Sequence, residues 1–208
     1  MYVPSHFAES DLSKLHDFIE QHSFGLLVSQ VEELPFATHL PFLLDRTREP
    51  YGVLVGHVAR ANPQWKELTQ RAALAVFSGP HAYISPTWYE ATNVVPTWNY
   101  AAVHATGRVE LVEEPTALLE IVQQSVNFYE SAMPKPWTLD ATGRFIERML
   151  DQIVGFRIRI EALDGKWKMS QNHPTERREK VIQALRTQSN SDANAVAEIM
   201  LQQLPPNS

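Results

Sequence analysis

The stretch Gly56–Trp65 brings a histidine and an arginine to the point where a predicted strand runs into a helix. A helix start presents free backbone N–H groups and a positive dipole end, and an arginine fork adds two parallel donors. A phosphate fits that combination, with His57, Arg60 and Asn62 as its ligands. The residues alone leave a second interpretation open, in which Asn62 only caps the helix and Arg60 is a surface charge.

Aromatic rings, prolines and hydroxyl groups gather in a second region, Ser78–Tyr89 and Val95–Tyr100. Flat rings beside polar groups and rigid turns suit the stacking and edge recognition of a planar heteroaromatic ligand. The same residue types suit a tightly packed dimer interface, so both interpretations stay open.

Three small polar side chains, Ser170, Gln171 and Asn172, follow Trp167–Met169 and precede another predicted helix. Amide side chains can read the carbonyl and N–H edge of a flavin or a nucleobase. Ordinary turn and cap chemistry is the competing explanation of the same residues, and residue type alone favours it.

Several other chemistries lack the residues that they need. The absence of cysteine removes disulfides, thiolate metal sites and cysteine nucleophiles. The candidate histidines have neither the short helical spacing of a zinc site nor carboxylates close by, so we expect no metal site. These histidines are His39, His57, His81, His104 and His173. No nucleophile elbow, Walker loop or Gly-x-Gly-x-x-Gly turn is present, which disfavours hydrolase, nucleotidase and Rossmann interpretations.

The charge balance disfavours generic DNA binding. The formal net charge is −6, with 24 acidic and 18 basic side chains, so a phosphate backbone offers little counterion release. The basic segment from Lys166 to Lys180 is the one candidate patch, and a solvated helix face explains it better. The first residues do not form a secretory signal, and no apolar run of about 18 residues occurs, so we expect a cytoplasmic protein.

Apolar periodicity predicts the elements that position these residues. The predicted helices are Ser10–Gln21, a short one opened by Pro63, one from Pro115 that ends before Pro134, Leu139–Ile153, Thr175–Arg186 and Asp192–Leu204. The predicted strands are Phe24–Val31, Pro35–Leu44, Val53–Val58, Ala72–Ser78, Ala82–Ile84, Tyr100–Val112 and one from Phe156 that turns back at Asp164-Gly165.

Long strands with few crossover helices favour an antiparallel barrel over a doubly wound sheet. We therefore expect an α+β protein, mainly antiparallel β, with peripheral helices. The main domain is predicted to span residues 1–174. Residues 175–208 form a helical extension that packs on the same domain or on a dimer partner.

Several strings of residues together resemble the PaiB family of FMN-binding proteins. They are Ala37–Phe42, Gly56–Trp65, Gly79–Pro86, Val95–Tyr100, Val103–Ala105 and Lys166–Asn172. The similarity covers nearly the whole chain, from Met1 to about Leu185, and leaves out the last helix.

The resemblance implies an FMN-binding split β-barrel, a fold shared with pyridoxamine-phosphate oxidases and flavin reductases. In that fold two subunits pair as a homodimer and the flavin lies at their interface. The cofactor-binding residues that it implies are His57, Arg60, Asn62, Trp65, Ser85, Trp98, Ser170, Gln171 and Asn172.

The family is named for negative regulation of sporulation and degradative-enzyme genes, which implies an FMN-binding transcriptional regulator. Direct contact with DNA is not expected, because no independent helix-turn-helix is present and the net charge has the wrong sign. Two alternatives remain: an FMN-dependent oxidoreductase, and a haem-binding protein with a histidine axial ligand.

Overall fold

The computed structural model describes residues 1–69 and 71–205, which divide into two compact units. The first, here called the sheet unit, contains residues 16–77 and 104–163. The second, here called the terminal unit, contains residues 1–15, 78–103 and 164–208. The division differs in kind from the predicted split at residue 174, because three long strands contribute to both units; the predicted domain boundary stays a prediction.

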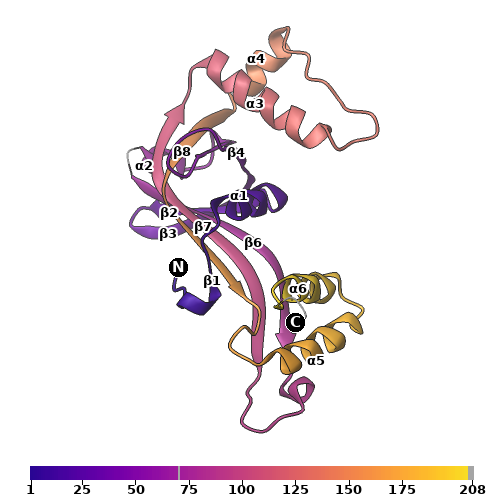
Figure 1. The fold of residues 1–208 in the computed structure, drawn as a ribbon. Coiled ribbons are helices and arrows are strands. Elements are labelled where there is room, and N and C mark those ends of the chain that lie inside the picture. The colour runs from indigo at the N-terminus through magenta and orange to yellow at the C-terminus, as the bar shows by residue number, and fades with distance from the viewer. Residues whose placement is uncertain (70, 206–208) are drawn as a thin grey trace. The chain divides into compact units, whose positions relative to one another are not determined.

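Figure 1 labels most of the elements. Those of the sheet unit are β2 (Phe24–Val31), β3 (Leu34–Pro41), β4 (Leu43–Asp45), β5 (Val53–Ala59), α2 (Trp65–Leu68), α3 (Pro115–Glu130) and α4 (Arg144–Leu150). Those of the terminal unit are the 3-10 helix η1 (Ser5–Phe7), β1 (Ala8–Glu9), the 3-10 helix η2 (Pro86–Tyr89), α5 (Thr175–Arg186) and α6 (Ser191–Gln202). The elements that cross the division are α1 (Leu12–Gln21), β6 (Ala72–Ile84), β7 (Thr97–Val112) and β8 (Ile153–Lys168).

The strands form one sheet in the order β3-β2-β6-β7-β8-β5-β4, with β1 paired to β8. In the sheet unit β3 also lies against β5, near the other end of that order, so the sheet curls back on itself. Gly56 permits this approach, because a Cβ there would lie 2.8 Å from the ring of Phe156 and 3.3 Å from the carbonyl oxygen of Pro41. The predicted α+β split β-barrel is confirmed.

Alternation along β5 gives the strand two different faces. Leu54 and Val58 point to the inner face, where Phe156 and Ile158 of β8 are also fully buried. Val55 points to the outer face, where it packs with Val112 of β7 and with Ile121 of α3. Helix α3 therefore covers part of the outer face of the sheet.

In the terminal unit α5 and α6 lie side by side, and α5 also packs against η2 (Figure 1). Their contact buries apolar side chains at helical spacing: Val181, Ile182, Leu185, Val196, Ala197 and Met200. Arg178 joins the two helices by donating from Nη2 to the carbonyl oxygen of Gln203, at 3.0 Å. No helix among the described residues is long and apolar enough to cross a membrane.

Two predicted strand breaks are wrong. Strand β6 continues through Gly79-Pro80, and β8 continues through Asp164-Gly165. At the second position the ladder with β1 pairs Gly165 with Glu9, and this pairing outweighs the local preference for a turn. The hairpin expected at Asp164-Gly165 is therefore absent from the described structure.

The helix predicted over Leu139–Ile153 is also wrong in its bounds and its buried face. It spans only Arg144–Leu150 and follows Gly143, whose φ is 103°. The apolar spacing of this segment predicts that Phe145, Ile146 and Met149 point inward. Ile146 is buried, with Leu150, against Leu118 of α3, whereas Phe145 and Met149 are exposed. The packing against α3, rather than the apolar residue count, selects the buried face.

Candidate functional site

Arg60, the predicted phosphate ligand, forms three hydrogen bonds within its own chain. Its Nε and Nη2 atoms donate to the carbonyl oxygens of Asp151 and Ile153, at 2.9 and 3.0 Å. Its Nη1 donates to the Glu113 carboxylate at 3.0 Å, and the guanidinium lies 5.8 Å from the ring centre of Trp65. Trp65 in turn donates from its indole nitrogen to the Arg60 carbonyl oxygen, at 2.9 Å. The arginine thus fastens the segment between α4 and β8 to the end of β5.

Asn62 is engaged in the same way. Its Oδ1 accepts from the backbone N–H of Gln64 at 2.9 Å, and its Nδ2 donates to the Thr38 hydroxyl at 2.9 Å. Gln64 is fully buried and donates to the Leu27 carbonyl oxygen and the Ser29 hydroxyl. Asn62 therefore stabilises a turn and connects it, through Thr38 and Gln64, to a buried network of hydrogen bonds.

The helix that was predicted to open at Pro63 begins only at Trp65 and spans four residues. A helix dipole needs several aligned peptide units, so a single turn offers an anion little. The predicted phosphate roles of Arg60 and Asn62 stay untested, but the donors assigned to them already have partners.

His57 keeps its ring on the outer face of β5, two residues after Val55 and opposite Gly155. The side chain is half-buried, and burial lowers the pKa of the imidazole below its usual value. A neutral imidazole can donate one hydrogen bond and accept another. His57 is therefore suited to a polar ligand group on this face.

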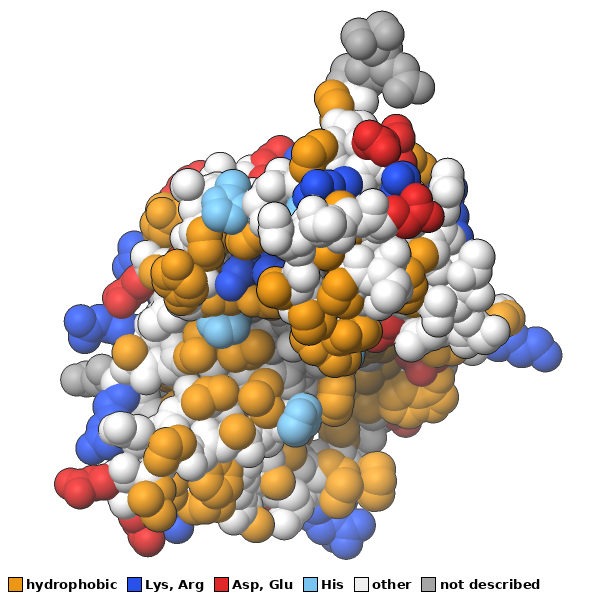
Figure 2. Space-filling model, turned by 90° about the horizontal axis from the view of Figure 1, so that it is seen from below, with side chains coloured by type: hydrophobic (Ala, Val, Ile, Leu, Met, Phe, Trp, Pro, Cys, Tyr) orange, Lys and Arg blue, Asp and Glu red, His pale blue; other side chains and the backbone are white. Residues whose placement is uncertain are grey.

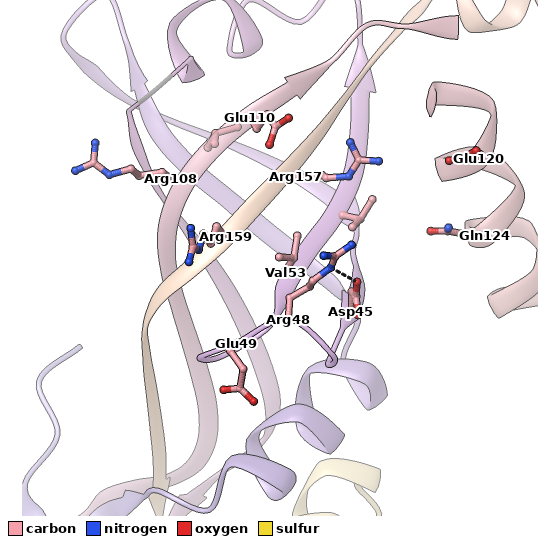
Figure 3. A pocket seen from close by; sticks show the side chains of 12 residues that line it. Asp45, Arg48, Glu49, Val53, Arg108, Glu110, Glu120, Gln124, Arg157 and Arg159 are labelled. Carbon is pink, nitrogen blue, oxygen red and sulfur yellow. Dashed lines mark hydrogen bonds and ion pairs between the residues drawn. The ribbon is translucent and has the colours of Figure 1, made fainter. Parts of the chain in front are cut away.

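The same outer face opens onto a pocket of about 1130 Å³, which lies entirely in the sheet unit (Figure 3). Val53 and Val55 form its apolar floor, and the strand register places Arg159 beside Val53 and Arg157 beside Val55. Figure 3 shows Glu120 and Gln124 of α3 across the pocket from these strands. The remaining lining residues are Asp45, Arg48, Glu49, Arg108, Val109 and Glu110.

The four arginines of this pocket differ in their partners. Arg48 pairs with Asp45 at 3.4 Å, and Arg108 pairs with Glu161 at 3.1 Å. Within residues 1–69 and 71–205, Arg157 and Arg159 form no ion pair, although Arg157 is half-buried. Guanidinium forks without a carboxylate favour binding of a phosphate or a carboxylate.

The pocket therefore fits an organic phosphate. Two unpaired guanidinium groups supply donors for the phosphate oxygens, and the two valines supply an apolar surface for a flat ring. In the sequence, Phe156, Ile158 and Ile160 alternate with Arg157, Arg159 and Glu161, which predicts the strand but does not by itself mark the arginines as site residues. Two arginines at positions i and i+2 of one strand share a face, and this spacing was the signal.

The remaining predicted residues lie in the terminal unit. Ser170 is buried with φ of 60°, and its hydroxyl lies 3.1 Å from the Tyr89 hydroxyl and 3.0 Å from Asn99 Nδ2. Gln171 accepts from the Met169 backbone N–H at 2.6 Å, while Asn172 is exposed. Ser170 and Gln171 thus perform turn chemistry, whatever else they do.

Ser85 caps η2, because its hydroxyl accepts from the Thr87 backbone N–H at 3.3 Å. Trp98 is 53% exposed and lines a second pocket, of about 350 Å³, together with Tyr83 and Trp88. The structure thus divides the nine predicted residues between the two units, four in the sheet unit and five in the terminal unit.

Comparison with known proteins places this geometry in a family. A family model described as "Putative FMN-binding domain" matches residues 1–162. The chain is 36% identical over 202 residues to "Protease synthase and sporulation protein PAI 2" of Bacillus subtilis, covering 96% of each protein. It is 32% identical to an uncharacterised protein of Aspergillus fumigatus, covering 88% of this chain and 90% of that protein.

Solved structures of low sequence identity share the fold. The flavocytochrome Anf3 from Azotobacter vinelandii superposes with a TM-score of 0.61 at 16% identity, covering 80% of this chain and 72% of that chain. The FAD and heme binding protein from Mycobacterium smegmatis gives 0.58 at 13% identity, covering 77% and 73%. Together with the family model and the bacterial relative, the fold shows that this chain belongs to the PaiB family of FMN-binding-domain proteins.

Proposed function

We propose that this protein binds FMN, with the flavin phosphate held by Arg157 and Arg159 in the pocket of the sheet unit. The observation that carries the proposal is the family match over residues 1–162, which include the whole sheet unit except its final residue. The pocket supports the location, because its two unpaired guanidinium groups flank an apolar floor.

The chemistry of the chain's own residues fits this ligand. Each guanidinium can donate two parallel hydrogen bonds to phosphate oxygens, and such charge-assisted bonds contribute about 1.5–3 kcal/mol each. Val53 and Val55 line the same pocket and would exclude water from beneath a flat ring. The neutral imidazole of His57, further along the same strand face, can donate one hydrogen bond to a polar group of the ligand.

A bound flavin would supply redox chemistry, and the protein's part is to bind it, orient it and control its exposure to water. We propose that this protein uses the flavin for regulation, as a negative transcriptional regulator of the sporulation and degradative-enzyme type. The name of its Bacillus subtilis relative, a protease synthase and sporulation protein, supports that role. The net charge of −6 favours regulation without direct contact with DNA.

The assembly proposed for this function is a homodimer, as the family resemblance implies. Light scattering on the purified chain at micromolar concentration is expected to give twice the mass of 23.6 kDa. A single-chain mass with and without FMN would contradict the dimer.

Titration with FMN tests the proposed function. The protein is expected to quench flavin fluorescence on binding FMN, and protein purified with its ligand should show flavin absorption in the visible range. A Soret band after haem addition, with no response to FMN, would favour a haem protein instead. Protein that neither carries flavin nor quenches added FMN would refute the proposal.

Once FMN is bound, rapid mixing with NADH or NADPH separates regulation from catalysis. Slow bleaching of the flavin, over minutes, is the expected result for a protein that senses its ligand. Bleaching within milliseconds would identify an oxidoreductase.

A further inference from the structure

We propose that the terminal unit carries a second small-molecule site, which takes an organic cation: a protonated amine on a small aromatic or apolar body. The site is the pocket of about 350 Å³ that Trp98 lines. This inference does not rest on the arginine pocket, none of whose residues takes part in it, although Trp98 is also a residue that the family resemblance implies for the cofactor.

The walls of the pocket come from separate segments of the terminal unit. Tyr83 lies on β6, Trp88 on η2 and Trp98 on β7, while Gln188 and Asp192 come from the end of α5 and the start of α6. The pocket is thus built by segments that only folding brings together. Its volume is near the lower end for ligand sites, which suits one ring with a short side chain.

Aromatic side chains supply the faces that an organic cation prefers. The rings of Tyr83 and Trp98 meet edge to face with their centres 5.9 Å apart, and these side chains are 47% and 53% exposed. Hydrophobic side chains also reach the surface in contiguous groups in the space-filling view of Figure 2. Electron-rich ring faces that stay exposed can attract an ammonium group, and tryptophan does so most strongly.

A carboxylate in the same pocket supplies the opposite charge. Asp192 lies 3.5 Å from the His81 imidazole, across an exposed contact that a ligand amine could replace.

The start of α6 would also attract an anion, and this alternative has to be weighed. Its capping position is already filled, since Asn190 Oδ1 accepts from the Asp192 backbone N–H at 2.8 Å. The nearby cation Lys168 donates to the Trp98 carbonyl oxygen at 2.7 Å and to the Thr97 hydroxyl, so it is engaged within the chain. The negative charge of Asp192 therefore sets the sign of the ligand.

Three ligands of one shape and different charge test the proposal by calorimetric titration of the full chain. They are phenethylamine, its neutral counterpart 2-phenylethanol, and the anion 3-phenylpropionate. The amine is expected to bind about tenfold more tightly than the alcohol, and the anion most weakly. Equal affinity for amine and alcohol, or tightest binding of the anion, would overturn the proposal without any variant.

Two matched variants locate the charge. Asp192→Asn keeps the shape of the side chain and is expected to remove the preference for the amine over the alcohol. Glu198→Gln removes a carboxylate of the same helix that pairs with Arg186 and does not line the pocket, so the preference should survive. A preference that survives Asp192→Asn, or that Glu198→Gln abolishes, would show that the cation binds elsewhere.

Discussion

The two pockets of this protein are lined by different kinds of side chain and differ in which charged groups lack a partner. The pocket of the sheet unit lies on the outer face of paired strands, with Arg157 and Arg159 unpaired above a valine floor. The pocket of the terminal unit gathers Tyr83 and Trp98 from strands β6 and β7 and Asp192 from the start of α6, and is about a third as large. The larger pocket therefore offers unpaired guanidinium groups to a ligand, and the smaller one offers a carboxylate among aromatic rings.

The comparison also separates polar groups that hold the fold from those that remain free for a ligand. Arg60 donates hydrogen bonds to the carbonyl oxygens of Asp151 and Ile153 and pairs with Glu113. Arg157 lines its pocket and has no carboxylate partner among the described residues. Residue type alone does not separate these two arginines. The two arginines differ in whether the fold brings hydrogen-bond acceptors close to their guanidinium groups.

Reversing one charge in the larger pocket should give the largest effect. Arg157→Glu replaces a phosphate donor by a repelling carboxylate, so FMN affinity is expected to fall more than about 100-fold in fluorescence titrations. Arg108→Gln is the matched control, because Arg108 lines the pocket but pairs with Glu161, and it should change affinity less than about fivefold. An unchanged FMN affinity in Arg157→Glu would show that Arg157 does not bind the flavin phosphate.

The larger pocket lies on one face of β5, and the packing of Gly56 against Phe156 fixes the position of that strand. Gly56→Ala would place a methyl group 2.8 Å from the fully buried ring of Phe156, and we expect the free energy of unfolding to fall by about 2 kcal/mol. Urea denaturation measures it, with Ala59→Ser on the exposed end of the same strand as a neutral control. Equal stability of the two variants would mean that Gly56 does not lie against the ring of Phe156 as described.

Arg60→Ala sharpens the distinction between a structural and a ligand-binding arginine. The loss of two hydrogen bonds to backbone carbonyl oxygens should lower the free energy of unfolding by about 2 kcal/mol in the same assay. FMN affinity, measured well below the unfolding transition, should change less than about threefold. A large loss of affinity with little loss of stability would restore the predicted phosphate role of Arg60.

A smaller effect concerns pH, and both units contribute to it. Burial lowers the pKa of His57, and burial with the Arg177 and Lys168 charges lowers the pKa of His173. The unfolded chain then binds protons more readily than the folded one. The stabilisation is therefore complete above the usual histidine pKa of about 6.5 and is lost as pH falls towards the folded values.

Urea denaturation at pH 7.5 and 5.5 measures this loss, which should be about 1 kcal/mol or less per histidine. His57→Gln should remove part of it, and His173→Gln another part. A stability that rises as the pH falls would contradict both assignments.

Much of the fold could be predicted from local sequence patterns. The bounds of β2 and α5 match the predictions residue for residue, because alternation and helical periodicity act locally there. Turn signals were misleading at Gly79-Pro80 and Asp164-Gly165, since partner strands from elsewhere in the chain impose extended backbone.

The candidate site was harder to predict for a related reason. The sequence shows which residues can donate a hydrogen bond but not which acceptors the fold brings to them. Asn62 forms a hydrogen bond with Thr38, which lies 24 residues away in the sequence. The Ser170 hydroxyl forms one with the Tyr89 hydroxyl, which lies 81 residues away. The resemblance to a family predicted the fold and the flavin cofactor. Only the structure shows that Arg157 and Arg159 form no ion pair among the described residues.

The central claim is that Arg157 and Arg159 hold the flavin phosphate, and a cycle of four dissociation constants tests it most directly. FMN and riboflavin, which lacks the phosphate, are titrated into the native protein and into the Arg157→Gln/Arg159→Gln variant. We expect the native protein to prefer FMN by about 100-fold and the variant to bind both ligands almost equally. An undiminished preference for FMN in the variant would place the phosphate elsewhere and contradict the account.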